Sequence, residues 1–342
     1  MRITLAVRAA LAAAWVAVSA SVASAQIYET VGIRAQGMGG AFVAVADDAT
    51  ASWWNPAGLP TGASFSAIVE RDTTEEPADP APSGPAWQSL ANGYSVAYPA
   101  LGLSYYRLRI SEIGPVPASS TAAGQPGRQD QGGAGVRLRS IAMNQLGASV
   151  GQSLGRHLVL GSTLKLVRAG SIASTDVAAE GALDHAADLD VPLETHSDLD
   201  LGAMASFGAA RLGVSVKHVT EPRFGEGDDS LLLSRQVRVG VAVLSAARGG
   251  DGVTVAFDAD LTRTATAVGD ARHVAAGAEA RLFQRRVGVR GGVSANTVGG
   301  LRASTSAGLS VGTRSGMYVD GAATFGADQS RNGWGFALRV TF

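Results

Sequence analysis

The chain ends on Trp334-Gly335-Phe336-Ala337-Leu338-Arg339-Val340-Thr341-Phe342, where large apolar residues alternate with small or polar ones. A strict period of two predicts a β-strand with one apolar face. A last strand that stops on an aromatic residue is typical of bacterial outer-membrane barrels. In such a barrel the apolar side chains contact lipid and Arg339 faces the interior. A soluble β-sandwich, which buries the same apolar face in its core, is the alternative.

Residues 1–25 have the features of a secretory signal peptide. A basic start precedes an apolar run over residues 9–22, and Ala23-Ser24-Ala25 forms a small-x-small cleavage site. A membrane-spanning helix is the alternative interpretation, but the run is shorter than the ~20 residues that a span requires. We therefore expect cleavage before Gln26 and export of the mature chain.

The composition narrows the possible classes of protein. The 342 residues include 44 Gly and no Cys, 17% are charged, and the formal net charge is -1. Without Cys, neither a lipid anchor nor a disulfide framework is expected. The balanced charge gives no reason to expect a nucleic-acid partner. We expect no cofactor, and a location in the cell outer membrane of a Gram-negative type.

Fourteen strand-like segments follow, joined by connections of two kinds. Short turns near Pro99-Ala100, Gly155 and Ala209-Ala210 alternate with long loops such as 170–197. Short turns at one end and long loops at the other are typical of an up-and-down membrane barrel, and an even strand number puts both chain ends on the periplasmic side. We therefore predict an all-β fold, a 14-stranded antiparallel transmembrane β-barrel over residues 63–342. The strands are expected near 63–70, 91–98, 101–110, 136–153, 156–169, 198–208, 211–220, 235–246, 252–263, 272–283, 286–295, 302–313, 316–326 and 333–342.

Charged residues in these segments lie opposite the apolar ones. A lipid-facing Arg near the bilayer midplane costs about 2–4 kcal/mol, so the charges should point into the lumen. The lumen-facing charges are predicted to be Arg238, Asp258, Asp260, Arg290 and Arg339, and the same face carries Arg137, Arg139, Lys165, Asp200, Lys217 and Glu279.

The segment before the first strand carries a specific pattern. It reads Gly32-Ile33-Arg34-Ala35-Gln36-Gly37-Met38-Gly39-Gly40-Ala41-Phe42, then Ala46-Asp47-Asp48-Ala49, and it ends on Trp54-Asn55-Pro56-Ala57-Gly58-Leu59. This segment resembles the FadL-like superfamily of outer-membrane proteins, most closely its PorV/PorQ-like and TraF-like branches. The resemblance implies a fourteen-stranded barrel and a short N-terminal hatch (a plug inside the lumen) over residues 26–62, with a small helix near residues 41–48.

Several residues of this hatch are candidates for gating. Its three glycines permit tight turns and close contact with the barrel wall. Its two adjacent aspartates favour turns and caps. Its two tryptophans are expected to anchor it against the wall. The candidates are Gly37, Gly39, Gly40, Asp47, Asp48, Trp53, Trp54, Asn55, Pro56 and Ala57.

The Asn-Pro-Ala motif has two interpretations. In family transporters this segment lies near a gap in the barrel wall through which a hydrophobic ligand leaves sideways, and Asn55, Pro56 and Ala57 match it. The alternative is a structural role, in which these residues only cap the hatch and join it to the first strand.

Other candidate sites are weaker. The glycines at 37–40 depart from the G-x-G-x-x-G spacing of a nucleotide-binding loop. The acidic stretch 176–200 is expected to be an extracellular loop, either simply solvated or binding Ca²⁺. His157, His218 and His273 are isolated in the sequence and are expected at the wall or rim. No nucleophile elbow is present, so no enzyme is predicted.

The sequence therefore predicts a non-enzymatic outer-membrane barrel of PorV/FadL-like type that acts in protein secretion or surface assembly. A passive channel for hydrophobic small molecules such as fatty acids is the alternative. The PorV-like motif and the polar lumen favour the first function. The expected partners are outer-membrane lipid, the barrel-assembly machinery through the Phe342 strand, and either secreted or surface proteins or hydrophobic small molecules.

Overall fold

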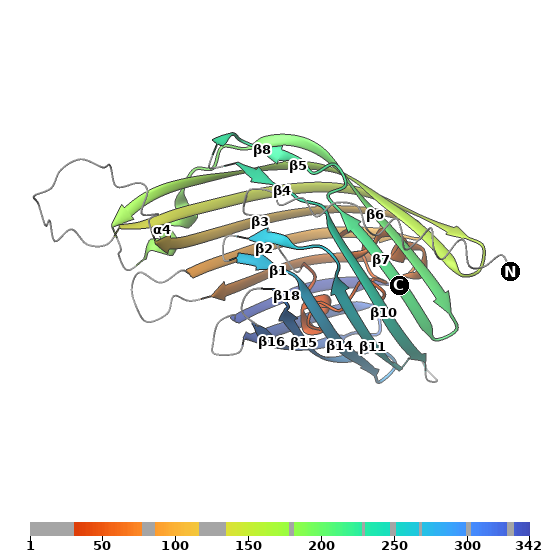
Figure 1. Ribbon diagram of the computed structural model, residues 1–342. Helices are drawn as coiled ribbons and strands as arrows, with labels where there is room; N and C mark the ends of the chain where they lie inside the picture. Colours follow the sequence, from red (N-terminus) through yellow and green to blue (C-terminus); the bar gives the residue numbers. More distant parts are fainter. Residues whose placement is uncertain are drawn as a thin grey trace, which may run out of the picture.

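The computed structural model describes residues 31–76, 86–115, 135–177, 181–227, 230–246, 251–266, 269–298, 302–326 and 332–342. The predicted signal peptide lies outside these residues. Within them, fourteen strands form one closed antiparallel barrel, and β1 closes it against β18 (Figure 1). The predicted 14-stranded antiparallel barrel is therefore confirmed.

The wall consists of fourteen strands, each antiparallel to its neighbours. They are β1 (Ser66–Glu76), β2 (Ala86–Tyr98), β3 (Leu101–Pro115), β4 (Gly135–Leu154), β5 (Leu158–Val177), β6 (Glu194–Phe207), β7 (Ala210–Lys217), β10 (Gln236–Ala246), β11 (Gly252–Asp260), β14 (His273–Leu282), β15 (Val287–Asn296), β16 (Ala303–Gly312), β17 (Met317–Gly326) and β18 (Asn332–Thr341).

The remaining elements are short. Two hairpins stand apart from the wall: β8 (Arg223–Phe224) with β9 (Leu231–Leu232), and β12 (Thr264–Thr266) with β13 (Gly269–Ala271). The helices are α2 (Ile33–Gly37), α3 (Ala51–Trp54), the 3-10 helix η2 (Pro56–Thr61) and α4 (Ala182–Asp188). Among the described residues, no helix is both long enough and apolar enough to cross a membrane.

The two ends of the barrel differ. β1 begins and β18 ends at one end, which also carries the tight turns after β2, β4, β6, β14 and β16. We call this the turn end and the opposite end the loop end. At the turn after β2, Ala100 has a φ of 72°, a left-handed conformation that a tight turn after Pro99 requires.

The outer face of the wall is apolar, whereas the inner face carries the buried charged side chains together with some apolar ones. Leu164, Val243 and Trp334 are 61%, 52% and 56% exposed, whereas Asp258, on the inner face of β11, is 1% exposed. A soluble sandwich would bury its large apolar side chains, whereas a bilayer solvates them. The distribution of side chains therefore fits a barrel surrounded by lipid.

Several wall strands are longer than the sequence pattern predicted. Residues 111–115, 170–177 and 194–197 were expected in loops but belong to β3, β5 and β6. These residues do not alternate cleanly between apolar and polar, yet their backbones pair, as in Glu112 with Arg139. The predicted long loop 170–197 also contains α4, which packs on Val136 and Leu138 of the extended wall.

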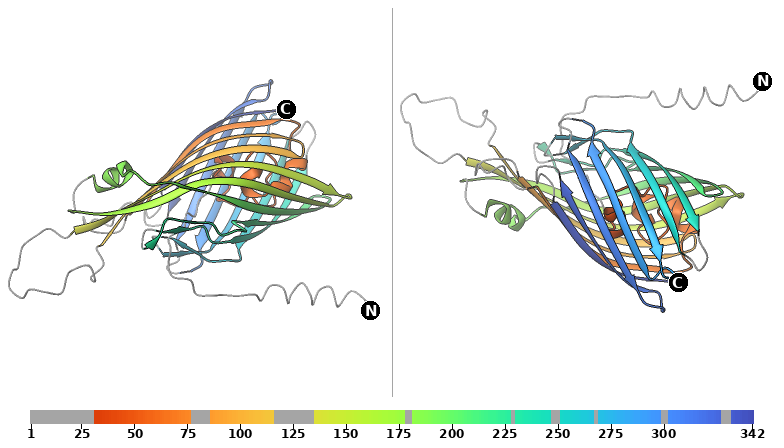
Figure 2. Two further views of the ribbon diagram at one scale, coloured as in Figure 1. Left: turned by 90° about the horizontal axis from the view of Figure 1, so that it is seen from above. Right: turned by 90° about the horizontal axis from the view of Figure 1, so that it is seen from below.

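The N-terminal segment (residues 31–65) lies inside the barrel, where its helices cross the lumen (Figure 2). Ala35, Met38, Phe42 and Ala46 are fully buried. Helical structure forms at α2, α3 and η2 and not near residues 41–48, so that expectation was wrong. There the chain makes only turns, and Asp258 accepts from the N–H groups of Phe42 and Val43.

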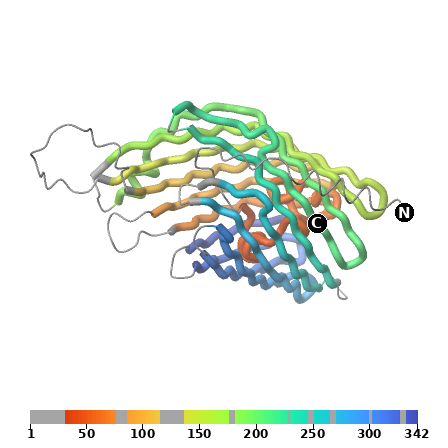
Figure 3. Tube along the Cα trace, in the orientation of Figure 1, coloured from red at the N-terminus to blue at the C-terminus, as the bar shows by residue number. Residues whose placement is uncertain are grey.

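Glycines in the wall allow this close fit. A Cβ at Gly161, Gly202 or Gly277 would collide with backbone or side-chain atoms of the N-terminal segment. The trace in Figure 3 shows the segment (red to orange) enclosed by the wall strands. Part of the high glycine content is therefore explained by contact between wall and segment.

The β8–β9 hairpin folds over the interior near the loop end. Phe224, Leu231 and Leu233 are buried, and they share one hydrophobic cluster with Val167 and Ala169 on the inner face of β5. The interior above the N-terminal segment is therefore packed with apolar side chains on this side of the barrel.

Candidate functional site

A buried charge network joins the N-terminal segment to the wall. Arg34 of α2 donates to Glu279 of β14 with Nη2–Oε2 at 2.7 Å, and to Asp48 with Nη1–Oδ2 at 3.0 Å. It also pairs with Asp47. All four side chains are largely buried. One guanidinium group therefore connects three carboxylates, two from the segment and one from the wall.

The network continues along the inner face of the wall. Arg290 donates from Nε to Glu279 at 2.8 Å and from Nη2 to Asp320 at 3.2 Å. Asp320 also accepts from Arg339 at 2.9 Å, and Arg281 pairs with Glu279 at 2.9 Å. The predicted site residues Arg290 and Arg339 thus lie on the inner face, in one chain of ion pairs from β14 to β18.

Both charges of the Arg34–Asp47 pair are stabilised. Burial alone would lower the pKa of Arg34, but the neighbouring carboxylates outweigh it and raise that pKa well above its usual value. Burial alone would raise the pKa of Asp47, but Arg34 and then Arg281 outweigh it and hold that pKa below its usual value. The pair therefore stays ionised over the physiological pH range.

Asp258 and Asn55 fix the backbone of the segment. Asp258 accepts from the N–H groups of Phe42 and Val43 at 2.7 and 2.8 Å. Asn55 donates from Nδ2 to the carbonyl of Val43 at 2.9 Å and to that of Ala203 in β6 at 3.2 Å.

The Asn-Pro-Ala motif caps η2. The Asn55 Oδ1 accepts from the N–H of Ala57 at 3.1 Å, and Pro56 is the first residue of η2. Beside the motif, the β5–β6 ladder runs without a break from Leu158–Ala205 to Ala169–Glu194. In the described residues, this geometry corresponds to the structural interpretation of the motif, and the wall beside it has no gap.

The two tryptophans lie between segment and wall. Trp54 donates from Nε1 to the carbonyl of Val31 at 2.7 Å, and Trp53 meets Tyr106 of β3 edge to face at 5.0 Å. Lys217 of β7 stands 3.6 Å above the Trp53 ring. Arg238 lies over Trp54 at 5.4 Å and pairs with Asp260 at 2.6 Å.

The glycines of the segment lie against strands β15 and β16. Gly39 and Gly40 have φ values of 68° and 86°, which favour glycine. A Cβ on Gly39 would lie 2.8 Å from the backbone nitrogen of Val293, and one on Gly37 would lie 3.1 Å from the Cα of Gly308. These positions require glycine because the segment touches the wall there.

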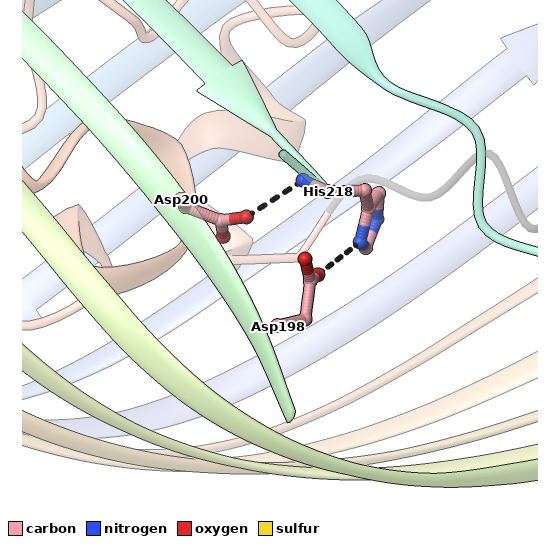
Figure 4. A group of neighbouring side chains, drawn as sticks. All are labelled: Asp198, Asp200 and His218. Atoms are coloured by element: carbon pink, nitrogen blue, oxygen red, sulfur yellow. Dashed lines mark hydrogen bonds and ion pairs between the residues drawn. The ribbon is translucent and has the colours of Figure 1, made fainter. Parts of the chain in front are cut away.

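A second buried charge cluster lies where β7 ends. Lys165 of β5 places its Nζ 2.7 Å from Asp198 and 2.6 Å from Asp200, both on the inner face of β6. His218 donates from its backbone N–H to Asp200 at 2.9 Å, and its Nδ1 lies 2.7 Å from Asp198 (Figure 4). All four residues are buried.

This cluster corrects two expectations. His218 is not isolated, and Asp198 and Asp200 are not in an extracellular loop. The cluster could not be predicted from the sequence, because Lys165, the two aspartates and His218 lie far from one another along the chain and meet only in the folded barrel. His157, at the turn end, stacks on Phe207 at 5.3 Å, and His273 begins β14, so these two do lie at the rim and wall.

Asp198, Asp200 and His218 are close enough together to ligate a metal ion. However, the Lys165 ammonium already contacts both carboxylates at the centre of the group. A fixed cation in this position offsets the charge of the carboxylates and opposes the entry of a second cation. The cluster is therefore an ion-paired connection between β5, β6 and the chain that leaves β7.

Comparison with known proteins places this architecture in a family. Residues 6–260 match the family model described as F plasmid transfer operon, TraF, protein. The chain belongs to the TraF family. This match confirms the resemblance to the TraF-like branch. A comparison with curated proteins finds no match.

The fold of this TraF family member also occurs in solved structures. The CymD monoaromatic hydrocarbon channel is 14% identical, with a TM-score of 0.64 over 91% of this chain and 97% of that one. The Ralstonia pickettii toluene transporter TbuX is 14% identical, with a TM-score of 0.61 over 92% and 99%. A Pseudomonas aeruginosa FadL homologue is 11% identical, with a TM-score of 0.61 over 93% and 99%. The predicted FadL-like fold is confirmed.

Proposed function

We propose that the protein is a non-enzymatic outer-membrane channel for the passive passage of hydrophobic small molecules, in which the N-terminal segment acts as a hatch. The observation that carries this proposal is the combination of a lipid-type outer surface with a lumen that the segment crosses and fills. The solved structures with this fold are named as a hydrocarbon channel, a toluene transporter and a FadL homologue. In the orientation predicted from the even number of strands, the turn end, where β1 begins and β18 ends, would face the periplasm.

The route of the hydrophobic molecule would pass through the apolar part of the interior, whose side chains are packed together in this structure. Tyr106, Leu108 and Ile110 of β3 and Met143 of β4 belong to the cluster that lies above the segment. Beside Trp53 the free volume is only about 20 Å³, which is too small for an aromatic hydrocarbon. The segment must therefore shift before a ligand can pass.

A disulfide lock tests this hatch. An ideal Cβ at Gly102 of β3 lies 2.7 Å from Ser52 Oγ in α3, which is within reach of a disulfide. The chain has no Cys, so the pair Ser52→Cys with Gly102→Cys gives a single bond. We would measure uptake of labelled toluene and labelled decanoate by cells that lack or express each form.

We expect the native protein to increase uptake, the oxidised pair to abolish that increase, and reduction to restore it. Ser52→Cys alone, treated with the same oxidant, is the matched control and should behave as the native protein. Uptake that does not depend on the protein would contradict the channel proposal. Uptake that persists when the disulfide is formed would contradict the hatch.

The predicted role in secretion or surface assembly is less well supported by these neighbours. One observation keeps this role as a second candidate: the description of the matching family names a plasmid transfer operon. Purification in mild detergent should then recover a stoichiometric exported partner, and this partner should remain when the disulfide lock is closed. No recovered partner would remove this candidate.

A further inference from the structure

A wide cavity opens at the turn end, below the N-terminal segment. Its volume is about 840 Å³, and it lies between Thr61 and Gly62 of the segment and the turns at 283–286 and 313–316. Of the described residues that line it, seven are arginines and three are acidic. The cavity is therefore strongly basic, although the chain as a whole has a net charge of -1.

The arginines divide into two sets. Those deep in the cavity are held by carboxylates of the charge network described above. Arg285, Arg286 and Arg314 lie in the two turns, and none has an ion-pair partner among the described residues. Three positive charges at the mouth of the cavity are therefore uncompensated.

A further arginine lies in the deep wall of the cavity. Arg290 is 3% exposed and uses Nε and Nη2 on Glu279 and Asp320, but its Nη1 has no hydrogen-bond partner among the residues that the structure describes. Arg290 lines the cavity beside Gly288, which has no side chain to cover it. A buried guanidinium N–H without an acceptor is costly, so this wall keeps positive charge that its neighbours do not fully satisfy.

The turn that carries two of the free arginines is held in place. The N–H groups of Gln284 and Arg285 donate to Asp251 Oδ1 at 2.7 and 3.2 Å. Phe283, Gln284 and Arg285 all have φ values between 55° and 66°, a left-handed run that non-glycine residues rarely adopt. Arg285 and Arg286 are thus fixed at the mouth by backbone contacts, and their guanidinium groups take no part in them.

We propose that this cavity binds a polyanion with two or more carboxylate or phosphate groups, presented from the periplasmic side. Planar guanidinium groups form paired hydrogen bonds with both kinds of anion. The anionic groups would pair with Arg285, Arg286 and Arg314 in the two turns. This site is separate from the hydrophobic route and does not depend on it.

The test is calorimetric titration of the folded full chain in neutral detergent with two probes, tripolyphosphate and a tetraglutamate peptide. The variant replaces the three free arginines together, as Arg285→Gln, Arg286→Gln and Arg314→Gln. A matched control removes three exposed arginines outside the cavity, as Arg156→Gln, Arg223→Gln and Arg263→Gln. Both variants lose the same net charge.

We expect saturable binding that weakens about tenfold or more in the cavity variant and by less than about twofold in the control. Raising the salt from roughly 50 to 300 mM should weaken binding to the native chain. Binding of tripolyphosphate alone would identify a phosphate ligand, and binding of the peptide alone would identify a carboxylate ligand. Binding of neither probe, or equal loss in both variants, would overturn the proposal.

Discussion

At the scale of single residues, Arg34 joins the N-terminal segment to the wall through a buried ion pair with Glu279. Its guanidinium contacts Asp47, Asp48 and Glu279, and none of these carboxylates lies in open solvent. A buried ion pair is weak evidence for net stability, but loss of one partner leaves charges that are buried and uncompensated. The segment should therefore be sensitive to this position in particular.

Replacing Arg34 by Met is expected to lower the free energy of unfolding by about 3–5 kcal/mol and to expose the segment to protease. Thermal unfolding in detergent, followed by electrophoretic mobility, and limited proteolysis would measure both effects. The control Arg314→Gln removes an exposed arginine and should change stability by less than about 0.5 kcal/mol. Equal stability of the two variants would show that the buried network does not hold the segment.

The wall glycines give a second prediction at this scale. Gly161→Val should displace the segment from the wall, because its Cβ would collide with the peptide that joins Pro56 to Ala57. Gly114→Val is the matched control, since no described residue lies within 4 Å of that Cβ. We expect faster proteolysis between residues 31 and 62 only in the first variant. The same cleavage rate in both variants would contradict the tight fit.

At the scale of elements, the Lys165 cluster connects β5 and β6 to the point where the chain leaves β7. His218, at this point, has a φ of 55°, and the chain then turns inward to the β8–β9 hairpin. The ion pairs lie beneath this hairpin and offset the charge of two buried carboxylates. The cluster therefore stabilises the bend.

Lys165→Met should destabilise the barrel by about 3–5 kcal/mol, because two buried carboxylates lose their cation. Adding Asp198→Asn and Asp200→Asn to that variant should recover part of the loss, since no uncompensated charge then remains. Unfolding temperatures of the two variants, compared with that of the native chain, would show this. A triple variant that is less stable than Lys165→Met would contradict the electrostatic explanation.

The elements also show what could be predicted from the sequence and why. Strand number followed from one-sided alternation, as in Val239 and Val241 around Gly240, because lipid imposes that pattern. The ends of β3, β5 and β6 could not be predicted in this way. Beyond the lipid neither face of a strand has to be apolar, so the sequence there does not alternate. The pairs Lys165–Asp198 and Arg34–Glu279 require strand register and the path of the segment, which a single sequence does not encode locally.

At the scale of the whole molecule, the outer surface, the interior near the loop end and the turn end of the barrel differ in their chemical character. Its outer surface is apolar, its interior near the loop end contains an apolar cluster, and its turn end opens into a basic cavity. The N-terminal segment separates the last two. The proposed channel would be closed at rest by this segment.

Single-channel conductance in planar bilayers tests that central claim most directly. The purified native chain would be compared with a variant that lacks residues 31–62, and both would first be shown to be folded by their resistance to detergent at room temperature. We expect the native chain to be silent and the shortened chain to conduct ions steadily. A native chain that conducts as well as the variant, or a folded variant that stays silent, would contradict the claim that this segment closes the lumen.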